Sequence, residues 1–297
     1  MNIQESKFME ENIMKKIISL VLVLMMALST LVACGGNTNA GNTAKVIDIE
    51  LTEEQYAFGV DPSQPELLEK VNTFIKQIKS DGTLDEIMNR YFSNGTPVAV
   101  TSAKKDASKD QLVVATNAEF APFEYTEGGA EFYGVDMEIA KLLADYLGKE
   151  LVIEHMDFDA VCLAVGNKQC DIAMAGLTIT EDRKEHVTFS EPYYNASQKL
   201  IVLTSNTEFD NCKTAADVEA ILKTKDTNCK IGVQTGTTGQ YYCEGDESWG
   251  FEGFPVTTVG MQNGSLAVQD MLNGKLDYVI IDSAPASFIV NSINKMQ

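Results

Sequence analysis

The chain has 297 residues, 44% of them hydrophobic and 22% charged, so it can form one large or two modest domains with an ordinary core. Its formal net charge of −20 repels phosphate backbones and anionic lipid headgroups, so we expect no nucleic acid partner and no direct membrane surface contact. The only histidines, His155 and His186, lie in unrelated segments, and the chain has no HExxH motif, paired CxxC or P-loop. No metal and no cofactor are therefore expected.

The beginning of the chain has the pattern of a secretory signal. Lys15 and Lys16 precede a run of apolar and small residues over 17–33, which is too short and too poorly flanked for a stable transmembrane anchor. The run ends in the sequence LVAC at residues 31–34, which resembles a bacterial lipobox, where the cysteine is lipidated and becomes the mature N-terminus. An uncleaved signal anchor is the alternative.

We accordingly expect a lipoprotein signal peptide over residues 1–33, with Met14 as a second candidate start. Cys34 would carry the lipid, and the small polar residues 34–44 would form a flexible tether. Five further cysteines follow. Cys162 and Cys170 lie among apolar neighbours and are expected to be buried, inert thiols. The sequence does not decide whether any of the five are paired in a disulfide: Cys162, Cys170, Cys212, Cys229 and Cys243.

The chain after the tether begins with short strands and two helices. Strands are predicted at 45–51 and 56–60, and apolar residues at three-to-four spacing predict a helix beginning near Pro65. Thr83 begins a second helix after the Asp81-Gly82 stop. Residues 93–110 are rich in Ser, Ala and Lys without periodicity, which predicts a linker.

A regular alternation of strands and helices follows the linker. This alternation predicts an α/β fold of mostly parallel open sheets with flanking helices, in which ligands bind outside the carboxyl ends of strands. The predicted strands are 112–116, 150–156, 170–176, 199–204, 230–236, 255–260 and 276–282. The predicted helices are 136–147, 158–166, 215–224, 237–243, 265–273 and 284–293.

Polar residues at three of these strand ends are suited to a free amino acid. Its carboxylate calls for an arginine and helix-end amides, and its ammonium calls for a carboxylate. Arg183 follows the apolar strand that runs into Thr178, although a single arginine is more often an ordinary surface residue. Phe120 follows another strand and is suited to stacking on the ligand, with core packing as the alternative.

The two remaining strand ends lie later in the chain. Gly236, Thr237 and Thr238 close a strand and begin a helix, a corner that can bind an anion but serves equally well as an ordinary N-cap. Asp282 ends the last predicted strand and precedes a helix, so it is either a partner for an ammonium or an N-cap.

Several segments together resemble the polar amino-acid solute-binding proteins of bacterial ABC importers. They are TNAEFAPFEY, FYGVDMEIAKLLADYLG, CDIAMAGLTITEDRKEHVTFSEPYY, IGVQTGTTGQYY, GKLDYVIID and PELLEKVNTFIKQIKSDGTLDEIMNRYF. The resemblance implies a two-lobe periplasmic binding protein type II fold with the ligand in the cleft, no catalytic chemistry, and an ABC permease as partner. It also implies an extracytoplasmic monomer anchored to the cell membrane through the N-terminal lipid only.

The same resemblance assigns roles to individual positions. Arg183 and Thr238 correspond to groups that hold the α-carboxylate, and Asp282 corresponds to the group that holds the α-ammonium. The remaining implied ligand-binding positions are the clamp residues Gly176 and Thr178, the stacking Phe120, the pocket-wall Phe158, and Asn117, where some relatives carry an acidic residue that reads cationic side chains. An asparagine at 117 weakens the case for a basic ligand.

The order of the segments departs from the family. The helix pair that ends the family's chains comes directly after the tether here, so the order resembles a circular permutation. The resulting domain map assigns 52–200 with the linker 93–110 to lobe 1, and 201–297 with strand 45–51 to lobe 2. Two other functions remain as alternatives. One is an enzyme on the same scaffold, resembling cyclohexadienyl dehydratase and using Glu119 or Glu124; the other is a sensor component that presents ligand to a receptor.

Overall fold

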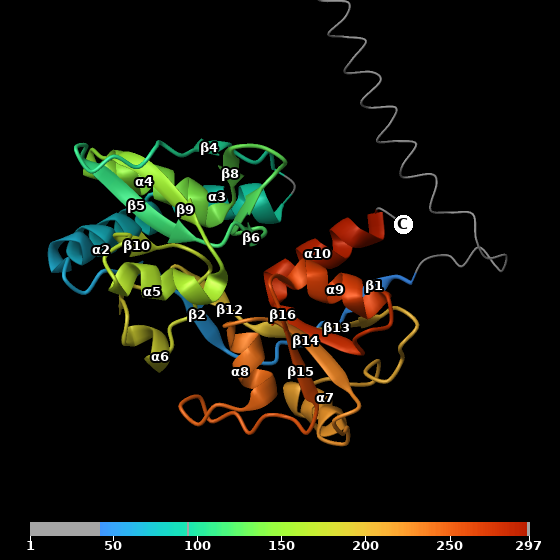
Figure 1. Ribbon diagram of the computed structural model, residues 1–297. Coiled ribbons are helices and arrows are strands. Elements are labelled where there is room, and N and C mark those ends of the chain that lie inside the picture. Colours follow the sequence, from blue (N-terminus) through green and yellow to red (C-terminus); the bar gives the residue numbers. More distant parts are fainter. Residues whose placement is uncertain (1–41, 94, 296–297) are drawn as a thin grey trace, which may run out of the picture. The chain divides into compact units, whose positions relative to one another are not determined.

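Two five-stranded sheets, each covered by helices, organise the chain into two lobes (Figure 1). The computed structural model describes residues 42–93 and 95–295. The predicted signal peptide, Cys34 and residues 35–41 of the predicted tether lie outside the described residues. Within the described part, no helix has both the length and the apolar character needed to cross a membrane.

Lobe 1 is built around a sheet with the order β11-β3-β10-β5-β9. Its strands are β3 (Gly59–Val60), β5 (Gln111–Thr116), β9 (Glu150–His155), β10 (Ile172–Ala173) and β11 (Thr188–Phe189). A smaller antiparallel sheet contains β4 (Val100–Thr101), β6 (Glu119–Phe120), β7 (Glu124–Thr126) and β8 (Glu131–Tyr133). The helices are α2 (Pro65–Ser80), α3 (Thr83–Phe92), α4 (Val135–Leu147), the 3-10 turn η1 (Phe158–Ala160), α5 (Val161–Gly166) and α6 (Glu181–Lys184).

Lobe 2 is built around a sheet with the order β1-β13-β16-β14-β15. Its strands are β1 (Ala44–Val46), β13 (Gln198–Leu203), β14 (Lys230–Gln234), β15 (Thr257–Met261) and β16 (Tyr278–Asp282). Its helices are α7 (Ala215–Leu222), α8 (Thr238–Glu244), α9 (Gly264–Leu272) and α10 (Ser283–Lys295). The chain passes between the lobes at β2 (Glu54–Tyr56) and β12 (Tyr194–Ala196), which pair antiparallel with each other.

Both faces of the lobe 2 sheet are buried, because the period of two along each strand sends alternate side chains to opposite sides. Leu200 and Val202 of β13 pack in one cluster with Val218 of α7. Ile201, between them, packs in another cluster with Val268 of α9. The near-continuous apolar sequence of this strand therefore follows from helices covering both sides of the sheet.

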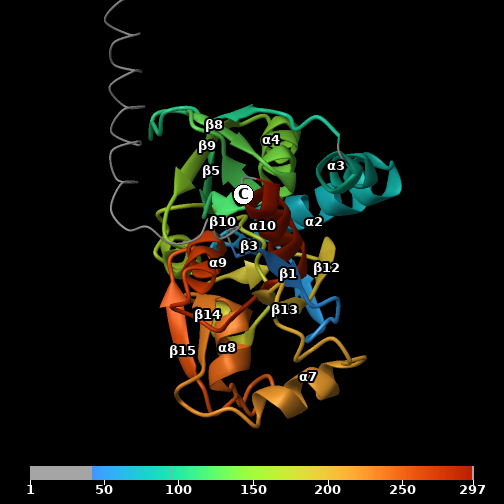
Figure 2. The ribbon, with the colours of Figure 1, turned by 90° about the vertical axis from the view of Figure 1, so that its right-hand side faces the viewer.

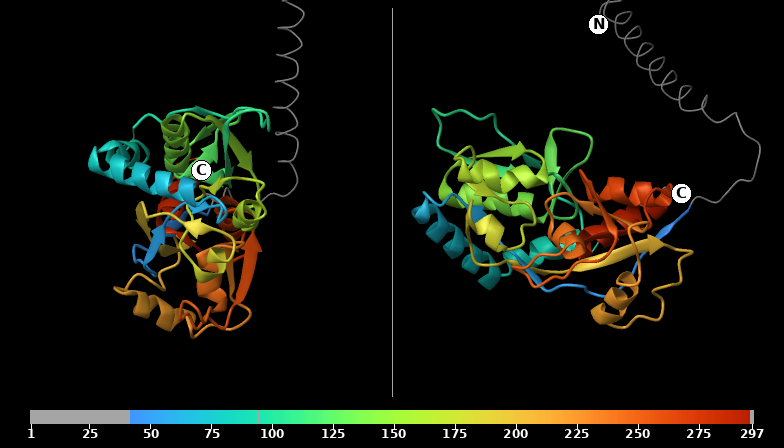
Figure 3. Two further views of the ribbon diagram at one scale, coloured as in Figure 1. Left: turned by 90° about the vertical axis from the view of Figure 1, so that its left-hand side faces the viewer. Right: turned by 60° about the horizontal axis from the view of Figure 1, so that its bottom comes forward.

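The first described strand lies beside the last helix. β1 pairs antiparallel with β13 and packs against α10, as Figures 2 and 3 show for the blue strand and the red helix. Asn42 and Thr43 of the predicted tether are also held here, by hydrogen bonds to Leu272 and Thr204. The strand predicted at 45–51 thus covers only 44–46, and the tether prediction is wrong for residues 42–44.

The predicted mixed α/β fold with two sheet-centred lobes is confirmed, but the sheets are not mostly parallel. In each large sheet two strand pairings are parallel and two are antiparallel, because β13 in lobe 2 and β3 in lobe 1 each run against both of their neighbours. The predicted boundary at residue 200 falls inside β13, so lobe 2 takes up the chain at Gln198.

The predicted linker is partly ordered on lobe 1. Val100 is 2% exposed and pairs with Phe132, and the Ala103 N–H donates to the Leu151 carbonyl oxygen at 2.9 Å. The Ser102 hydroxyl accepts a hydrogen bond from the Ile153 N–H at 2.8 Å. The segment after residue 97 is therefore an edge of the lobe rather than a free connector.

Candidate functional site

All nine residues predicted to bind a ligand are described, and all nine are buried. Those of lobe 1 follow β5 and β10 or lie in η1 and α6, whereas those of lobe 2 follow β14 or end β16. Arg183 and Asn117 of lobe 1 each form a hydrogen bond with a residue of lobe 2. The candidate site is therefore built from the carboxyl ends of strands in both sheets, as expected for open α/β sheets.

Arg183 of lobe 1 reaches across to lobe 2. Its side chain is 7% exposed in α6, whose first turn is capped by the Thr180 hydroxyl. The guanidinium Nη1 donates to the Thr178 carbonyl oxygen at 2.7 Å, and Nη2 donates to the Gly236 carbonyl oxygen at 3.1 Å. Within the described ranges no carboxylate forms an ion pair with it. Arg183 is thus a buried cation held by neutral carbonyl oxygens.

Two aromatic rings line the lobe 1 side of the site. The Arg183 Cζ lies 5.1 Å from the centre of the Phe158 ring, a cation–π contact that helps to fix the guanidinium. Phe120 packs directly over Gly176, because a Cβ placed on Gly176 would lie 3.0 Å from the Phe120 Cε1. Gly176 also has a φ of +53°, which a larger residue would adopt only with strain.

Two of the predicted groups have their donors engaged inside the protein. The Gly176 N–H donates to Asp136 Oδ2 at 2.8 Å, so this amide does not face a ligand. The Thr237 hydroxyl donates to the Gln234 carbonyl oxygen at 2.8 Å, which makes Thr237 a turn cap. Thr237 holds the N-cap position of α8, but its side chain makes no capping hydrogen bond to the helix.

Asp282 ends β16 and is 4% exposed. Its Oδ1 accepts a hydrogen bond from the Tyr56 hydroxyl at 2.5 Å, and Tyr56 lies on the crossover strand β2. Burial, followed by the negative charge of Glu54, raises the pKa of Asp282 to about 7, although hydrogen bonds from Tyr56 and Gln198 oppose the shift. A cation beside Asp282 would relieve this cost, so the position suits an ammonium group.

Asn117 is held by groups from both lobes. Its Nδ2 donates to the Met156 carbonyl oxygen at 2.8 Å, and its Oδ1 accepts from Gln234 Nε2 at 3.1 Å. The Gln234 Oε1 is buried and has no partner among the described residues. The free acceptor at this end of the site is therefore Gln234, a residue that the sequence did not single out.

Glu54 is the main site residue that the sequence analysis missed. It lies on β2, is 5% exposed, and its Oε2 accepts hydrogen bonds from Thr178 at 2.6 Å and Thr238 at 2.8 Å. One carboxylate thus joins a lobe 1 hydroxyl to a lobe 2 hydroxyl. The local pattern TEEQY does not indicate that Glu54 links the two lobes, because Glu54 and the exposed Glu53 look alike in sequence.

Two further carboxyls are buried behind the site. Asp136 accepts from the Tyr193 hydroxyl at 2.5 Å as well as from Gly176, yet burial raises its pKa to about 7. Glu124 is fully buried with neither oxygen partnered in the described chain. Burial, assisted by the charges of Asp136 and Asp282, raises the pKa of Glu124 well above its usual range. Among the buried residues described, Arg183 is the only cation and carboxyls predominate.

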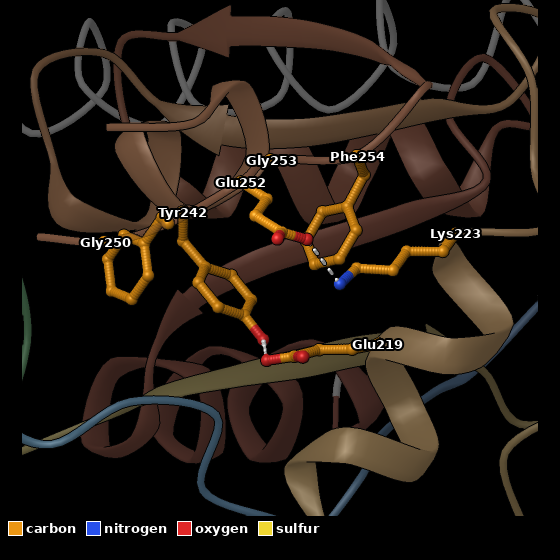
Figure 4. Close-up of a pocket in the computed structure, with 8 residues that line it drawn as sticks. Glu219, Lys223, Tyr242, Gly250, Glu252, Gly253 and Phe254 are labelled. Carbon is orange, nitrogen blue, oxygen red and sulfur yellow. Dashed lines mark hydrogen bonds and ion pairs between the residues drawn. The ribbon is translucent and has the colours of Figure 1, made fainter. Parts of the chain in front are cut away.

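A separate cavity lies at the other end of α8 (Figure 4). Its polar side chains pair with one another, because the Tyr242 hydroxyl donates to Glu219 at 2.8 Å and Lys223 lies 2.9 Å from Glu252. The described residues contain no cluster of His, Cys, Asp and Glu suited to a metal ion. Cys162, Cys170 and Cys243 are buried, and none of the five described cysteines forms a disulfide. The inter-lobe site therefore remains the candidate.

Comparison of the sequence with protein families gives a match over most of the chain. Residues 6–94 and 112–283 match the family described as bacterial extracellular solute-binding proteins, family 3. The arginine-binding extracellular protein ArtP of Bacillus subtilis is 30% identical over 68% of this chain and 72% of its own length. A probable histidine-binding protein of Neisseria gonorrhoeae is 31% identical over 60% of this chain and 62% of its own length, just under two thirds.

Solved structures give a consistent result. An ancestral arginine-binding protein bound to arginine is 32% identical, with a TM-score of 0.53, and the match covers 63% of this chain and 76% of that one. An ancestral amino-acid-binding protein, described as a precursor of cyclohexadienyl dehydratase, is 28% identical with a TM-score of 0.53 and covers 71% of this chain and 78% of its own.

Proposed function

Because the chain belongs to the bacterial extracellular solute-binding proteins of family 3, we propose that it captures a free polar amino acid between its lobes and delivers it to an ABC import permease. The observation that carries this proposal is the pair Arg183 and Asp282. Both are buried, they have opposite charge, and they come from opposite lobes. A ligand that bridges them stabilises the closed arrangement of the lobes, and this is the state a permease can recognise.

The two charged groups suit the two ends of a zwitterion. The Arg183 guanidinium donates only to carbonyl oxygens among the described residues, so a ligand carboxylate would supply the charge partner that the described chain does not provide. Asp282 is an ionisable acceptor whose charged form is disfavoured by burial, so a ligand ammonium would stabilise it.

The charge of the surroundings limits the ligand class. Glu54 and Asp282 are buried in the site, and Arg183 is the only buried cation among the described residues. A second carboxylate on the ligand would therefore be repelled, and we propose a ligand with a neutral or basic side chain. The carboxamide pair of Asn117 and Gln234 leaves the Gln234 Oε1 free to accept a hydrogen bond from that side chain.

A thermal-shift screen of the chain without residues 1–34 against the common amino acids tests the proposal. A ligand at one hundred times its dissociation constant stabilises the protein by about 2.7 kcal/mol, which raises the melting temperature measurably. We expect at least one neutral or basic amino acid to do so, and aspartate and glutamate to have the smallest effects. The absence of stabilisation by every amino acid would contradict the proposed function.

We further propose that Cys34 is lipidated and anchors the protein to the outer side of the cell membrane, as a monomer. The lysine-led apolar run and the LVAC sequence at 31–34 support this proposal. Pull-down of a permease with the ligand-loaded protein tests delivery, and capture of a signalling receptor instead would favour the sensor alternative.

The enzyme alternative has weaker support in the site. Glu119 is exposed and accepts a hydrogen bond from Asn263 Nδ2 at 3.0 Å, so it lies at the surface rather than in the site. Glu124 is fully buried, and it could act as an acid only if a substrate reached it. The similar protein described as a precursor of cyclohexadienyl dehydratase is itself named as an amino-acid-binding protein.

We also propose that the natural gene is a circular permutation of the family order. Support comes from the position of β1, which pairs with β13 and packs against α10. The segment 44–92 supplies β1, β2, β3, α2 and α3, each packed against elements that come later in the chain.

A further inference from the structure

The carboxylate of Glu54 collects four hydrogen bonds. Its Oε1 accepts from the Thr52 hydroxyl at 2.6 Å and from Gln198 Nε2 at 3.1 Å. Its Oε2 accepts from the hydroxyls of Thr178 and Thr238 at 2.6 and 2.8 Å. A carboxylate has about four lone-pair sites, so these donors saturate it.

The direction of these hydrogen bonds is fixed by the neighbouring groups. An ionised carboxylate only accepts, so every proton in the cluster must come from its partners. The Thr52 hydroxyl accepts from the Gln198 N–H at 2.9 Å, and the Thr238 hydroxyl accepts from Gln198 Nε2 at 3.0 Å. Rotating the Gln198 amide would turn its oxygen toward the carboxylate, which is repulsive. The hydroxyls of Thr52, Thr178 and Thr238 therefore all point their protons at Glu54.

A hydroxyl has one proton, so the two threonines of the site cannot also donate to a ligand. Thr178 and Thr238 present only lone pairs to anything bound between the lobes. This differs from the expectation that the Thr238 hydroxyl helps to hold the ligand carboxylate. A carboxylate beside these oxygens would meet acceptors, whereas an ammonium would meet acceptors it can donate to.

We propose that Glu54 is the positioning residue that makes Thr178 and Thr238 hydrogen-bond acceptors, and thereby commits their side of the site to the ligand's ammonium. The carboxylate is left to Arg183. Glu54 acts through the two hydroxyls and through its charge beside Asp282, without itself needing to touch the ligand. This inference rests on the proposed amino-acid function, and it concerns how that site distinguishes the two ends of a zwitterion.

The variant Glu54→Gln tests the inference because it keeps the shape and reverses part of the hydrogen bonding. A carboxamide has one acceptor oxygen and two N–H donors, so either the Thr178 and Thr238 hydroxyls or the Thr52 hydroxyl and the Gln198 amide must turn round. Glu53→Gln is the matched control, since Glu53 is the adjacent, exposed carboxyl and the substitution removes the same charge. Circular dichroism establishes that both variants fold.

The probes are two amino acids and their deaminated counterparts: L-arginine with 5-guanidinopentanoic acid, and L-glutamine with glutaramic acid. Calorimetry should show that Glu54→Gln weakens binding of the preferred amino acid by about tenfold to a hundredfold, because hydrogen bonds to a charged group are lost. Binding of the deaminated acid should change by less than about threefold. Glu53→Gln should match wild type for both. An unchanged preference for the amino acid over the deaminated acid in folded Glu54→Gln would overturn the inference.

A second measurement needs no ligand and remains informative if Glu54→Gln does not fold. Carbon-13 labelling of glutamate gives a carboxyl resonance for Glu54, which assignment by through-bond correlation identifies in the wild-type protein. The inference requires the chemical shift of a carboxyl group that only accepts hydrogen bonds. A protonated Glu54 would donate one hydrogen bond, free a threonine proton and overturn the inference. Failure of every amino acid to bind the wild type would instead contradict the proposed function, and the resonance would still decide the state of Glu54.

Discussion

Ala44 and Asn294 are 250 residues apart in the sequence and are joined by two hydrogen bonds. The Ala44 N–H donates to Asn294 Oδ1 at 3.1 Å, and Asn294 Nδ2 donates to the Ala44 carbonyl oxygen at 2.8 Å. A side-chain amide at the end of α10 therefore replaces the strand neighbour that the outer edge of β1 lacks. In the circular permutation that we propose, this pair marks the junction between the helix and the strand, which non-covalent contacts hold together here.

The first prediction follows from this closure. A rearranged gene that begins at Pro97, runs to Gln297 and continues through a short linker into residues 42–92 should fold and bind the same amino acid. Starting at Pro97 retains the buried Val100 and the Ala103 contact with β9. Changing which ends are joined alters loop-closure entropy only weakly, by about 0.6 kcal/mol for each doubling of loop length.

Circular dichroism melts and calorimetry of both chain orders measure the outcome. A matched control is the same rearranged gene beginning at Gln111, which discards the ordered edge at 100–103 and should melt at a lower temperature. A rearranged protein that stays unfolded, or that prefers another ligand, would count against the permutation.

The second prediction concerns the charged pair. Arg183→Ala or Asp282→Ala should weaken amino-acid binding by roughly thirty-fold to several-thousand-fold, since truncating one partner of a desolvated charge pair costs about 2–5 kcal/mol. Lys184→Ala is the control, because Lys184 neighbours Arg183 but is exposed and pairs with Glu181. Calorimetry beside circular dichroism separates lost binding from lost folding. Near-wild-type affinity in a folded variant would remove that residue from the site.

The third prediction concerns the predicted anchor, which lies outside the described residues. Cells expressing the full chain with Cys34→Ser should release it from the membrane fraction, because the lipid would have no attachment point. Cys229→Ser, in the folded part, is a control that should remain in the membrane fraction. Immunoblots of membrane and soluble fractions give the answer, and equal membrane retention of Cys34→Ser would show that the anchor is elsewhere.

The sequence predicted those parts of the fold that local pattern determines. The helices beginning at Pro65 and Thr83 and the later α/β alternation follow from apolar periodicity, which the buried stripes of Val71, Ile75 and Ile78 confirm. The short sheet β4-β8-β7-β6 was not predicted, because strands of two or three residues have no room for an alternating pattern. Their hydrogen bonds come from neighbours brought together by the rest of lobe 1.

The sequence predicted where the charged residues of the candidate site lie along the elements, but not the hydrogen bonds around them. Arg183 and Asp282 lie at strand or helix ends as expected, because a charged residue after an apolar strand marks the edge of a sheet. The hydrogen-bonding directions were not predictable. They depend on Glu54, whose partners Thr178 and Thr238 lie 124 and 184 residues away in the sequence. Proton direction at a hydroxyl is a property of tertiary contacts, and no local pattern encodes it.

The last prediction concerns pH. Burial raises the pKa of Asp282 from 3.8 to about 7, so the folded chain holds this proton more tightly than the unfolded chain does. Between about pH 4 and pH 7 the folded state binds more protons, and the free energy of unfolding of the ligand-free protein should therefore fall as the pH rises. Asp136, with a pKa also raised to about 7 by burial, adds to the same slope. Asp282→Asn should reduce the slope without abolishing it.

Ligand affinity should change in the opposite direction over the same window. The ammonium of an amino acid pairs with ionised Asp282, so binding below pH 7 must release the proton, and affinity should rise by up to about tenfold for each pH unit toward 7. Calorimetry in buffers of different ionisation enthalpy would detect proton release in wild type and in Glu53→Gln. The variant Asp282→Asn should bind the amino acid weakly, and binding should release few protons because residue 282 no longer carries a carboxyl group. Proton release that persists unchanged in Asp282→Asn would assign the titrating group to another residue and remove Asp282 from the ammonium site.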